Sequence, residues 1–386
     1  NKKKRYSQKQ TKLFSFFIYL ILTANCFSIE TTAKQAILID FNSGDVLFKK
    51  NEDVKVSPAS LTKIMTTIIA FDLIQRGELK LTEKFIVSEK AWKHSKQGYS
   101  SMFIMPNDKI TVENLLKGII IASGIDACVA LAEGIAGSEE SFVMMMNEKS
   151  KNIGMKSTSF SNSSGIYSEN NYSTVSDIAL MSSYLIKNYS ELYKLYGEKS
   201  FTWERTGGKP ITQPNRNSLL FRGNNYDGIK TGYLSDSGYA LAASMKDGER
   251  RLISVVNGTL SNVERTRESL KLLNYAVISS DLIKIQKNNP LLVADFWNGK
   301  INQTKLHLKE DVFFTYNKRK SKDLIVSINV DQPLKKRFKI NDEVGSLTIK
   351  DNSGFSKEFS LYASEDFAKI NFVKKFINTI NFLIWG

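Results

Sequence analysis

Residues 57–66 read Ser57-Pro58-Ala59-Ser60-Leu61-Thr62-Lys63-Ile64-Met65-Thr66, and an apolar run continues from them to Ile74. The run predicts a helix from residue 61 to residue 74, with Gly77 as its C-cap. Residues at positions i and i+3 share one face of a helix, so the Lys63 amine can reach the Ser60 hydroxyl. No other serine in the sequence has a lysine three residues later. The pair therefore predicts a serine nucleophile beside a lysine that accepts its proton.

The first 28 residues have the pattern of a secretory signal peptide. Basic residues between Lys2 and Lys12 precede the apolar run from Leu13 to Ala24, and cleavage is predicted after Ser28. An uncleaved membrane anchor is the alternative, although the run is shorter than the roughly 20 apolar residues of a spanning helix. The segment holds six basic residues and no acidic one, so its removal lowers the formal net charge from +15 to +9.

Charge and residue usage argue against several classes of partner and site. A basic exported protein meets anionic lipid and wall polymer, and its scattered basic residues form no RNA-binding motif, so no nucleic-acid partner is expected. His94 and His307 lie far apart without ligand spacing, which argues against a zinc site and a Ser-His-Asp triad. After cleavage Cys128 is the one cysteine left, so no internal disulfide is expected.

Strand and helix patterns alternate in blocks over the 386 residues, which indicates an α+β fold class in about two domains. Alternation and turn residues predict strands at residues 35–41, 45–49, 237–245 and 250–258. Apolar periodicity predicts helices at residues 110–121, 126–135 and 262–277. Ser123 lies at the junction between the first two of these helices. The strand Gly228-Ile229-Lys230-Thr231-Gly232-Tyr233 has flanking glycines, which let an extended peptide approach its edge.

The residue pattern of the sequence changes after residue 277. Short apolar alternations separated by turn residues predict a small all-β module at residues 278–363, without a cluster of catalytic residue types. Residues 364–386 contain an amphipathic helix from Phe367 to Trp385, whose large apolar side chains fall in one arc. Lysines flank this arc, so the helix is expected to anchor the protein in the plane of a membrane surface. Packing on the protein's own core is the alternative.

Three motifs occur in the order found in the penicillin-recognising serine acyltransferases. They are Ser60-x-x-Lys63, Ser123 at a helix junction, and Lys230-Thr231-Gly232 on a strand. With the strings Asn162-Ser163-Ser164-Gly165-Ile166 and Tyr172-Ser173-Thr174, the chain resembles the low-molecular-mass D-alanyl-D-alanine carboxypeptidases of that family. The resemblance covers residues 35–277, and the β module and terminal helix match as well. The expected organisation is a signal peptide (1–28), a catalytic domain (29–277), a β domain (278–363) and an anchoring helix (364–386).

The resemblance implies a role for each matching residue, without a metal or other cofactor. Ser60 would attack the carbonyl between two terminal D-alanines of a peptidoglycan stem peptide, and β-lactam antibiotics would acylate it. Lys63 would accept its proton, and Ser123 would relay one to the leaving D-alanine. The remaining family positions are Lys230, Thr231, Gly232, Tyr233 and Arg265. They would bind the carboxylate and the backbone of the substrate or would form the oxyanion hole together with the Ser60 N–H. The implied location is the periplasmic face of the inner membrane.

One departure from the family pattern affects the expected activity. The second motif of the family is Ser-x-Asn, and Ile125 occupies the asparagine position here. The asparagine amide bonds the substrate backbone and the first-motif lysine, and loss of one such bond costs about 1–3 kcal/mol when its partners stay buried. Weak turnover is one expectation, and compensation by Asp126 or a water is another. A nearly inactive penicillin-binding wall protein is the alternative function. A β-lactamase is less expected, because its E-x-x-L-N motif is missing.

Overall fold

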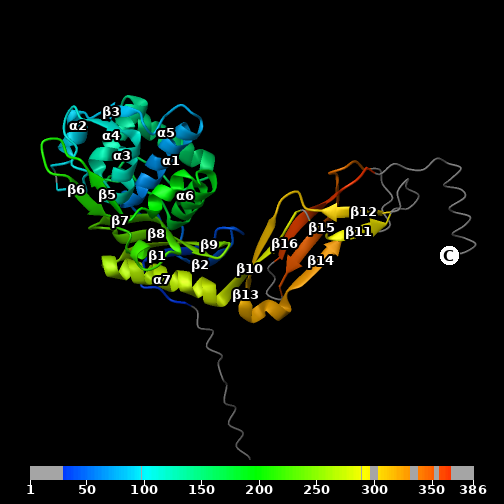
Figure 1. Cartoon of the computed structure of the whole chain (residues 1–386). Helices are drawn as coiled ribbons and strands as arrows, with labels where there is room; N and C mark the ends of the chain where they lie inside the picture. The colour runs from blue at the N-terminus through cyan, green and yellow to red at the C-terminus, as the bar shows by residue number, and fades with distance from the viewer. Residues whose placement is uncertain are drawn as a thin grey trace, which may run out of the picture. The chain divides into compact units, whose positions relative to one another are not determined.

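The computed structural model describes residues 29–96, 98–287, 289–295, 303–330, 338–351 and 356–366 (Figure 1). The predicted signal peptide and the helix predicted from Phe367 onward lie outside the described residues. Within the described ranges, no helix combines the length and the apolar character that crossing a membrane requires.

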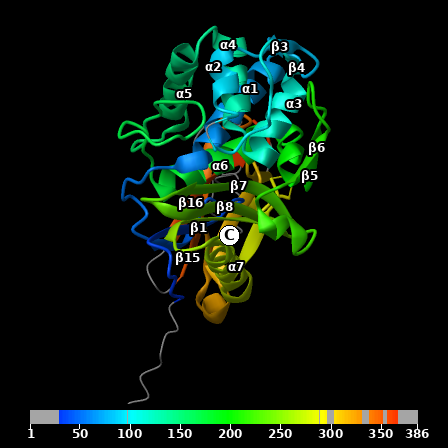
Figure 2. The same cartoon turned by 90° about the vertical axis from the view of Figure 1, so that its left-hand side faces the viewer.

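A five-stranded antiparallel sheet lies at the centre of the catalytic domain (Figure 2). Its order is β2-β1-β9-β8-β7. The strands are β1 (Gln35–Asp40), β2 (Val46–Lys50), β7 (Tyr226–Leu234), β8 (Gly238–Asp247) and β9 (Arg250–Thr259). Both hairpins predicted from alternation are confirmed, and the glycine-flanked strand is β7 at the edge of the sheet. An edge strand has a hydrogen-bonded neighbour on one side, so its other side can pair with an extended peptide.

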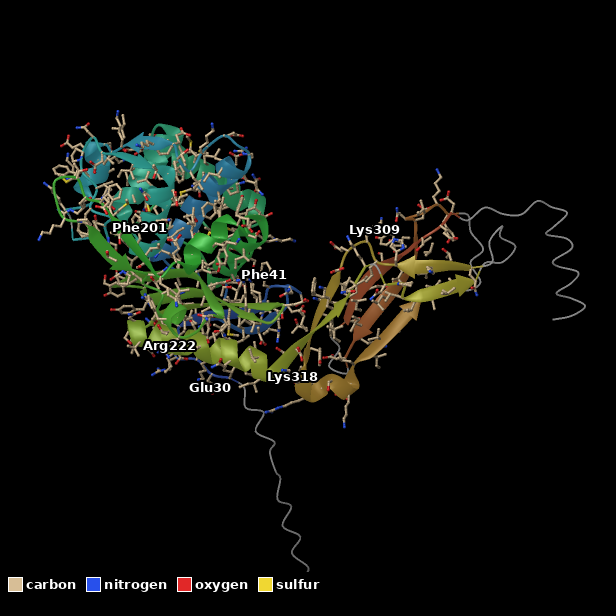
Figure 3. The ribbon with its side chains drawn as sticks, viewed as in Figure 1. Glu30, Phe41, Phe201, Arg222, Lys309 and Lys318 are labelled. Atoms are coloured by element: carbon tan, nitrogen blue, oxygen red, sulfur yellow. The ribbon has the colours of Figure 1, made fainter. Side chains whose placement is uncertain are left out.

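Helices cover both faces of this sheet (Figures 1 and 2). Helix α7 (Asn262–Ser279), predicted at 262–277, runs along one face. On the other face lie α1 (Lys63–Gln75), α4 (Ile125–Ala136), α5 (Glu139–Ile153) and α6 (Val175–Asn188). Side chains crowd the space between these helices and the sheet (Figure 3). Nearly every residue of β9 is therefore buried, because neither of its faces meets solvent.

Helix α1 is one of the helices on the face of the sheet opposite α7. Every residue from Lys63 to Phe71 is buried, as expected of a helix that is apolar on all sides. The helix ends at Gln75 with Gly77 in a left-handed conformation, as predicted. Its start differs from the prediction, because residues Ala59–Thr62 form a 3-10 turn and the α-helix begins only at Lys63.

The helix predicted at residues 110–121 is wrong in its detail. The segment is divided into strand β4 (Lys109–Thr111), helix α3 (Val112–Lys117) and a π-helical turn (Gly118–Ala122). Thr111 caps α3 by accepting a hydrogen bond from the N–H of Asn114, which starts the helix later than apolar periodicity suggests. The remaining elements of this domain are β3 (Lys84–Ile86), α2 (Glu89–Lys93), β5 (Ser200–Trp203) and β6 (Ile211–Pro214).

The described part after α7 consists of β-strands and the 3-10 turn Lys318–Asp323, which confirms the prediction of an all-β domain. Strand β10 (Ser280–Ile285) pairs with β13 (Val312–Asn317). A five-stranded sheet has the order β11-β12-β16-β15-β14, with β11 (Leu292–Asp295), β12 (Gln303–His307), β14 (Ile325–Asn329), β15 (Glu343–Lys350) and β16 (Ser356–Ala363). Leu306, Phe314 and Leu361, which come from both of these sheets, belong to one hydrophobic core.

Candidate active site

Ser60 lies in the 3-10 turn that precedes α1. Side chains at positions i and i+3 eclipse in a 3-10 helix, so the lysine of the first motif lies directly beside the serine. Lys63 Nζ is 3.0 Å from Ser60 Oγ. The predicted contact between nucleophile and base is therefore present, although the turn that makes it is 3-10 and not α-helical.

The amine of Lys63 is enclosed by protein. Its side chain is 1% exposed, and Nζ also donates a hydrogen bond to the carbonyl oxygen of Ser164. Burial lowers the pKa of Lys63 below its ordinary value, and the positive charge of Arg216 acts in the same direction. A lowered pKa increases the neutral fraction of the amine at physiological pH, and only the neutral amine can take the serine proton.

Ser123 and Lys230 form a second pair of the same kind. Ser123 ends the π-helical turn in a left-handed conformation, with φ +60°, at the predicted junction before α4. Lys230 Nζ on strand β7 donates to Ser123 Oγ over 3.0 Å, and this lysine is 2% exposed. Burial holds the pKa of Lys230 well below its ordinary range, and the nearby charges of Lys63, Arg216 and Arg265 lower it further. The fold thus brings two serine–lysine pairs to one place.

A cavity of about 650 Å³ opens beside the nucleophile. Six of the eight predicted site residues line it: Ser60, Ser123, Thr231, Gly232, Tyr233 and Arg265. The two lysines lie buried behind this lining and contact the hydroxyl groups of Ser60 and Ser123. Strand β7 passes close to the nucleophile turn, since a Cβ added at Gly232 would lie 3.3 Å from the carbonyl oxygen of Pro58. The absence of a side chain at this glycine permits the close approach.

Two arginines make the cavity strongly cationic. Arg265 donates to the carbonyl oxygen of Gly232 over 2.9 Å, and burial lowers its pKa to about 10. Arg216 lines the same cavity, and burial lowers its pKa as well. Among the residues that the structure describes, neither arginine has an ion-pair partner, and no residue lining the cavity is acidic. The cavity is therefore suited to an anionic group.

Sequence reasoning missed Arg216. This arginine stands in the short loop between β6 and the 3-10 turn Ser218–Phe221, where no motif or periodic pattern marks it. Its position in the cavity depends on contacts with residues that are distant in the chain. The one signal for it in the sequence is that an arginine can bind a carboxylate.

Ile125 occupies the position of the family's asparagine at the start of α4. Its side chain is 7% exposed, and its backbone N–H donates to the carbonyl oxygen of Ser100 over 2.9 Å. The neighbouring carboxylate of Asp126 is turned away from the cavity and accepts hydrogen bonds from Ser95 Oγ, Ser101 Oγ and the N–H of Met102. This geometry contradicts the expectation that Asp126 stands in for the missing asparagine, because its oxygens already bind Ser95 and residues 101–104.

The loop of residues 162–165 completes the surroundings of Lys63. Asn162 Oδ1 accepts the N–H of Gly165 over 2.6 Å, which closes the loop on itself. Gly165 has φ +82°, and a Cβ there would lie 1.8 Å from the carbonyl oxygen of Ala59. Only glycine fits both the left-handed backbone and this close approach. The loop therefore packs directly against the turn that carries Ser60.

Comparison with known proteins identifies the family to which the chain is similar. Residues 23–260 match the D-alanyl-D-alanine carboxypeptidase family, and residues 284–369 match the C-terminal domain of penicillin-binding protein 5. The chain is 35% identical over 347 residues to the D-alanyl-D-alanine carboxypeptidase DacF of Bacillus subtilis, with 88% of this chain and 87% of DacF covered. It is 36% identical over 340 residues to the D-alanyl-D-alanine carboxypeptidase DacC of Escherichia coli, at 86% and 84% coverage.

A solved structure agrees with these relatives. Penicillin-binding protein 5 from Haemophilus influenzae is 33% identical and has a TM-score of 0.81, over 89% of this chain and 99% of that protein. The match extends beyond the catalytic domain into the β domain, so the family resemblance expected from the three motifs is confirmed. By fold, by motif order and by its relatives, the chain belongs to the family of serine-type D-alanyl-D-alanine carboxypeptidases.

Proposed function

We propose that this D-alanyl-D-alanine carboxypeptidase removes the terminal D-alanine of peptidoglycan stem peptides through an acyl-enzyme on Ser60. The observation that carries the proposal is the contact between Ser60 Oγ and the buried amine of Lys63, at the edge of a cavity with two arginines. A free carboxylate at the end of the substrate matches the positive charge of Arg216 and Arg265 in this cavity, which favours an exopeptidase.

Acylation begins with a proton transfer. As Ser60 Oγ attacks the carbonyl carbon of the penultimate D-alanine, its proton moves to the neutral amine of Lys63. The negative charge that develops on the carbonyl oxygen would be bound by the backbone N–H groups of Ser60 and Tyr233, an effect often worth a few kcal/mol. The buried positive charge of the site favours the same oxyanion.

Collapse of the tetrahedral intermediate breaks the peptide C–N bond. Ser123 Oγ, which accepts a 3.0 Å hydrogen bond from Lys230, gives its proton to the leaving nitrogen. Ser123 then receives the proton that Lys63 took from Ser60, so Lys63 is neutral again. Free D-alanine leaves with its carboxylate, which Thr231, Arg265 and Arg216 held at the cavity wall. Water then attacks the ester carbonyl and gives a proton to the neutral amine of Lys63. This amine passes the proton to the Ser60 oxygen as the ester C–O bond breaks, so the hydroxyl of Ser60 is restored.

Intact-mass measurement after incubation with benzylpenicillin tests the nucleophile. The β-lactam carbonyl should acylate Ser60, and the opened ring stays attached as one covalent adduct. The adduct should disappear in Ser60→Ala, while labelling that survives this change contradicts the assignment. Release of D-alanine from a peptide ending in D-Ala-D-Ala tests hydrolysis separately.

A nearly inactive penicillin-binding protein is the second candidate function, and one observation favours it. The buried isoleucine at position 125 has no group that could bond the substrate backbone. Slow turnover with normal penicillin labelling would support this second function, and steady release of D-alanine would exclude it.

The location proposed for the protein rests on the residue patterns of its N-terminal and C-terminal segments. Residues 1–28 would direct export, and the apolar arc between Phe367 and Trp385 would hold the mature protein at the periplasmic face of the inner membrane. The positive net charge that remains after cleavage favours contact with anionic lipid and wall polymer. This location would bring the catalytic domain to its peptidoglycan substrate.

A further inference from the structure

A carboxylate outside the active-site cavity holds the loop that contacts Lys63. Glu139 Oε1 accepts hydrogen bonds from the N–H of Ser163, over 3.0 Å, and from Ser163 Oγ, over 2.7 Å. The Glu139 side chain is only 13% exposed. We propose that Glu139 is a positioning residue, which orients the amine of Lys63 toward Ser60 through the peptide unit of Ser163 and Ser164.

The path from Glu139 to Lys63 is short and continuous. Ser163 is buried, and its carbonyl oxygen accepts a hydrogen bond from Thr66 Oγ1 on α1. The next carbonyl oxygen, that of Ser164, accepts from Lys63 Nζ one turn earlier on the same helix. The loop is therefore fixed to α1 through two carbonyl groups and to the start of α5 through Glu139.

The other hydrogen bonds of this loop are internal. Asn162 Oδ1 accepts from the N–H groups of Ser164 and Gly165, and its amide donates to the carbonyl oxygen of Ile166. These bonds shape the loop but tie it to no neighbouring element. Among the described residues, the side chains from outside the loop that bond Ser163 are those of Thr66 and Glu139, so removal of the Glu139 carboxylate leaves Thr66 as the one side-chain partner of Ser163.

The Ser164 carbonyl has a defined chemical role in the proton transfer. A neutral lysine amine that donates one N–H to this oxygen directs its lone pair at the hydroxyl of Ser60. When the serine proton arrives on Nζ, the same carbonyl stabilises the ammonium that forms. A displaced carbonyl therefore weakens the base in two ways: it leaves the lone pair poorly aimed, and it lowers the pKa of Lys63.

Several charged and titratable groups act on Lys63, and the pKa of one of them, the Cys128 thiol, is raised mainly by burial and also by the charge of Glu139. They come from the loop after β6, from strand β7 and from α4: Arg216, Lys230, Cys128 and Asp126. None of these groups is hydrogen-bonded to Glu139. A change in the pH profile that appears in Glu139→Ala and is absent in the equally uncharged Glu139→Gln is therefore expected to arise from the loop and not from the charge of Glu139.

Glu139→Ala in the full chain tests the proposal, with the second-order rate constant of acylation by benzylpenicillin measured against pH. We expect the maximal rate constant to fall about tenfold, and the acidic limb of the profile to move to lower pH because the pKa of Lys63 falls. Glu139→Gln should restore both, since its amide oxygen can accept the same two hydrogen bonds. Glu140→Ala is the matched control: Glu140 is 78% exposed and pairs with the same Lys90 as Glu139.

Two results would overturn the proposal. One is a Glu139→Ala protein with the wild-type rate constant and profile. The other is a Glu139→Gln protein as impaired as Glu139→Ala, which would mean that negative charge and not a hydrogen-bond acceptor is required. If thermal denaturation shows that Glu139→Ala does not fold, Glu139→Asp decides. It keeps the charge but withdraws the oxygens from Ser163, so a wild-type profile for a folded Glu139→Asp protein also counts against the proposal.

Discussion

The amine of Lys230 donates a hydrogen bond to the hydroxyl of Ser123 over 3.0 Å, although 107 residues separate them in the chain. Lys63 makes the corresponding bond to Ser60 at the other side of the cavity. Both lysines are buried, and for both of them burial is the main cause of a lowered pKa. The site thus holds two amines whose charged forms are disfavoured by burial. Both amines therefore lower the stability of the fold at neutral pH, and the proposed function requires them.

Replacement of Lys63 by methionine should stabilise the fold at neutral pH, and the gain should shrink as the pH rises. The unfolded chain has the ordinary lysine pKa of 10.5, while the pKa in the fold is lower. Between the two values the unfolded state binds more protons, so wild-type stability rises with pH and approaches that of the variant. Urea denaturation at pH 7 and pH 9.5 measures the difference. The exposed Lys80→Met is the control, and a gain that grows with pH contradicts the sign.

Arg216→Gln should raise KM for a D-Ala-D-Ala peptide by roughly tenfold, because a positive charge that faces the substrate carboxylate is lost. The charge of Arg216 also lowers the pKa of Lys63, so its removal should move the acidic limb of kcat/KM to higher pH. Steady-state kinetics across pH 5–9 measures both effects. Arg222→Gln should leave both unchanged, because Arg222 (labelled in Figure 3) is exposed and does not line the cavity. An unaltered KM in Arg216→Gln would remove this residue from the carboxylate site.

Ile125→Asn should raise the rate of D-alanine release by about tenfold or more, which corresponds to roughly 1.4 kcal/mol or more off the barrier. The amide would hold the substrate backbone and Lys63 in line in the transition state, which isoleucine cannot do. Thermal stability should change little by comparison. The measurement is D-alanine release from a D-Ala-D-Ala peptide. A folded variant with an unchanged or lower rate would mean that the site is already adapted to isoleucine.

Truncation before Phe367 should release the mature protein from membranes without loss of penicillin labelling. The apolar arc of the last segment would supply the affinity for the membrane surface, and we expect the catalytic domain to fold and to react with penicillin without it. Fractionation of cells that express the full-length and truncated chains, followed by labelling of each fraction, gives the comparison. A full-length protein found entirely in the soluble fraction would instead indicate that the segment packs on the protein itself.

The parts of the fold that could be predicted from the sequence depend on local patterns. Alternation located the hairpins of β1–β2 and β8–β9, and the i, i+3 spacing located the Ser60–Lys63 contact. The exact start of α1 could not be predicted, because apolar residues fit a 3-10 turn as well as an α-helix. The same ambiguity concealed the π-helical turn at Gly118–Ala122.

The parts of the site that could not be predicted depend on contacts between distant segments. Arg216 and Glu139 carry no motif, and each acquires its role from a neighbour far away in the chain. Asp126 was identified as a candidate replacement for the asparagine because it adjoins Ile125. Its carboxylate instead binds a loop more than 20 residues earlier, where several N–H groups need an acceptor.

The edge position of strand β7 has a consequence for the solubility of the protein. An unpaired strand edge is a template on which other chains can add strands and begin aggregation. Here the residues from Gly228 to Gly232 are buried, so the edge forms part of a recess and is not presented on the surface. A single extended peptide needs less room beside a recessed edge than the sheet of another molecule, so the recess favours the peptide. The protein can therefore keep an open edge for its substrate with little risk of polymerising through it.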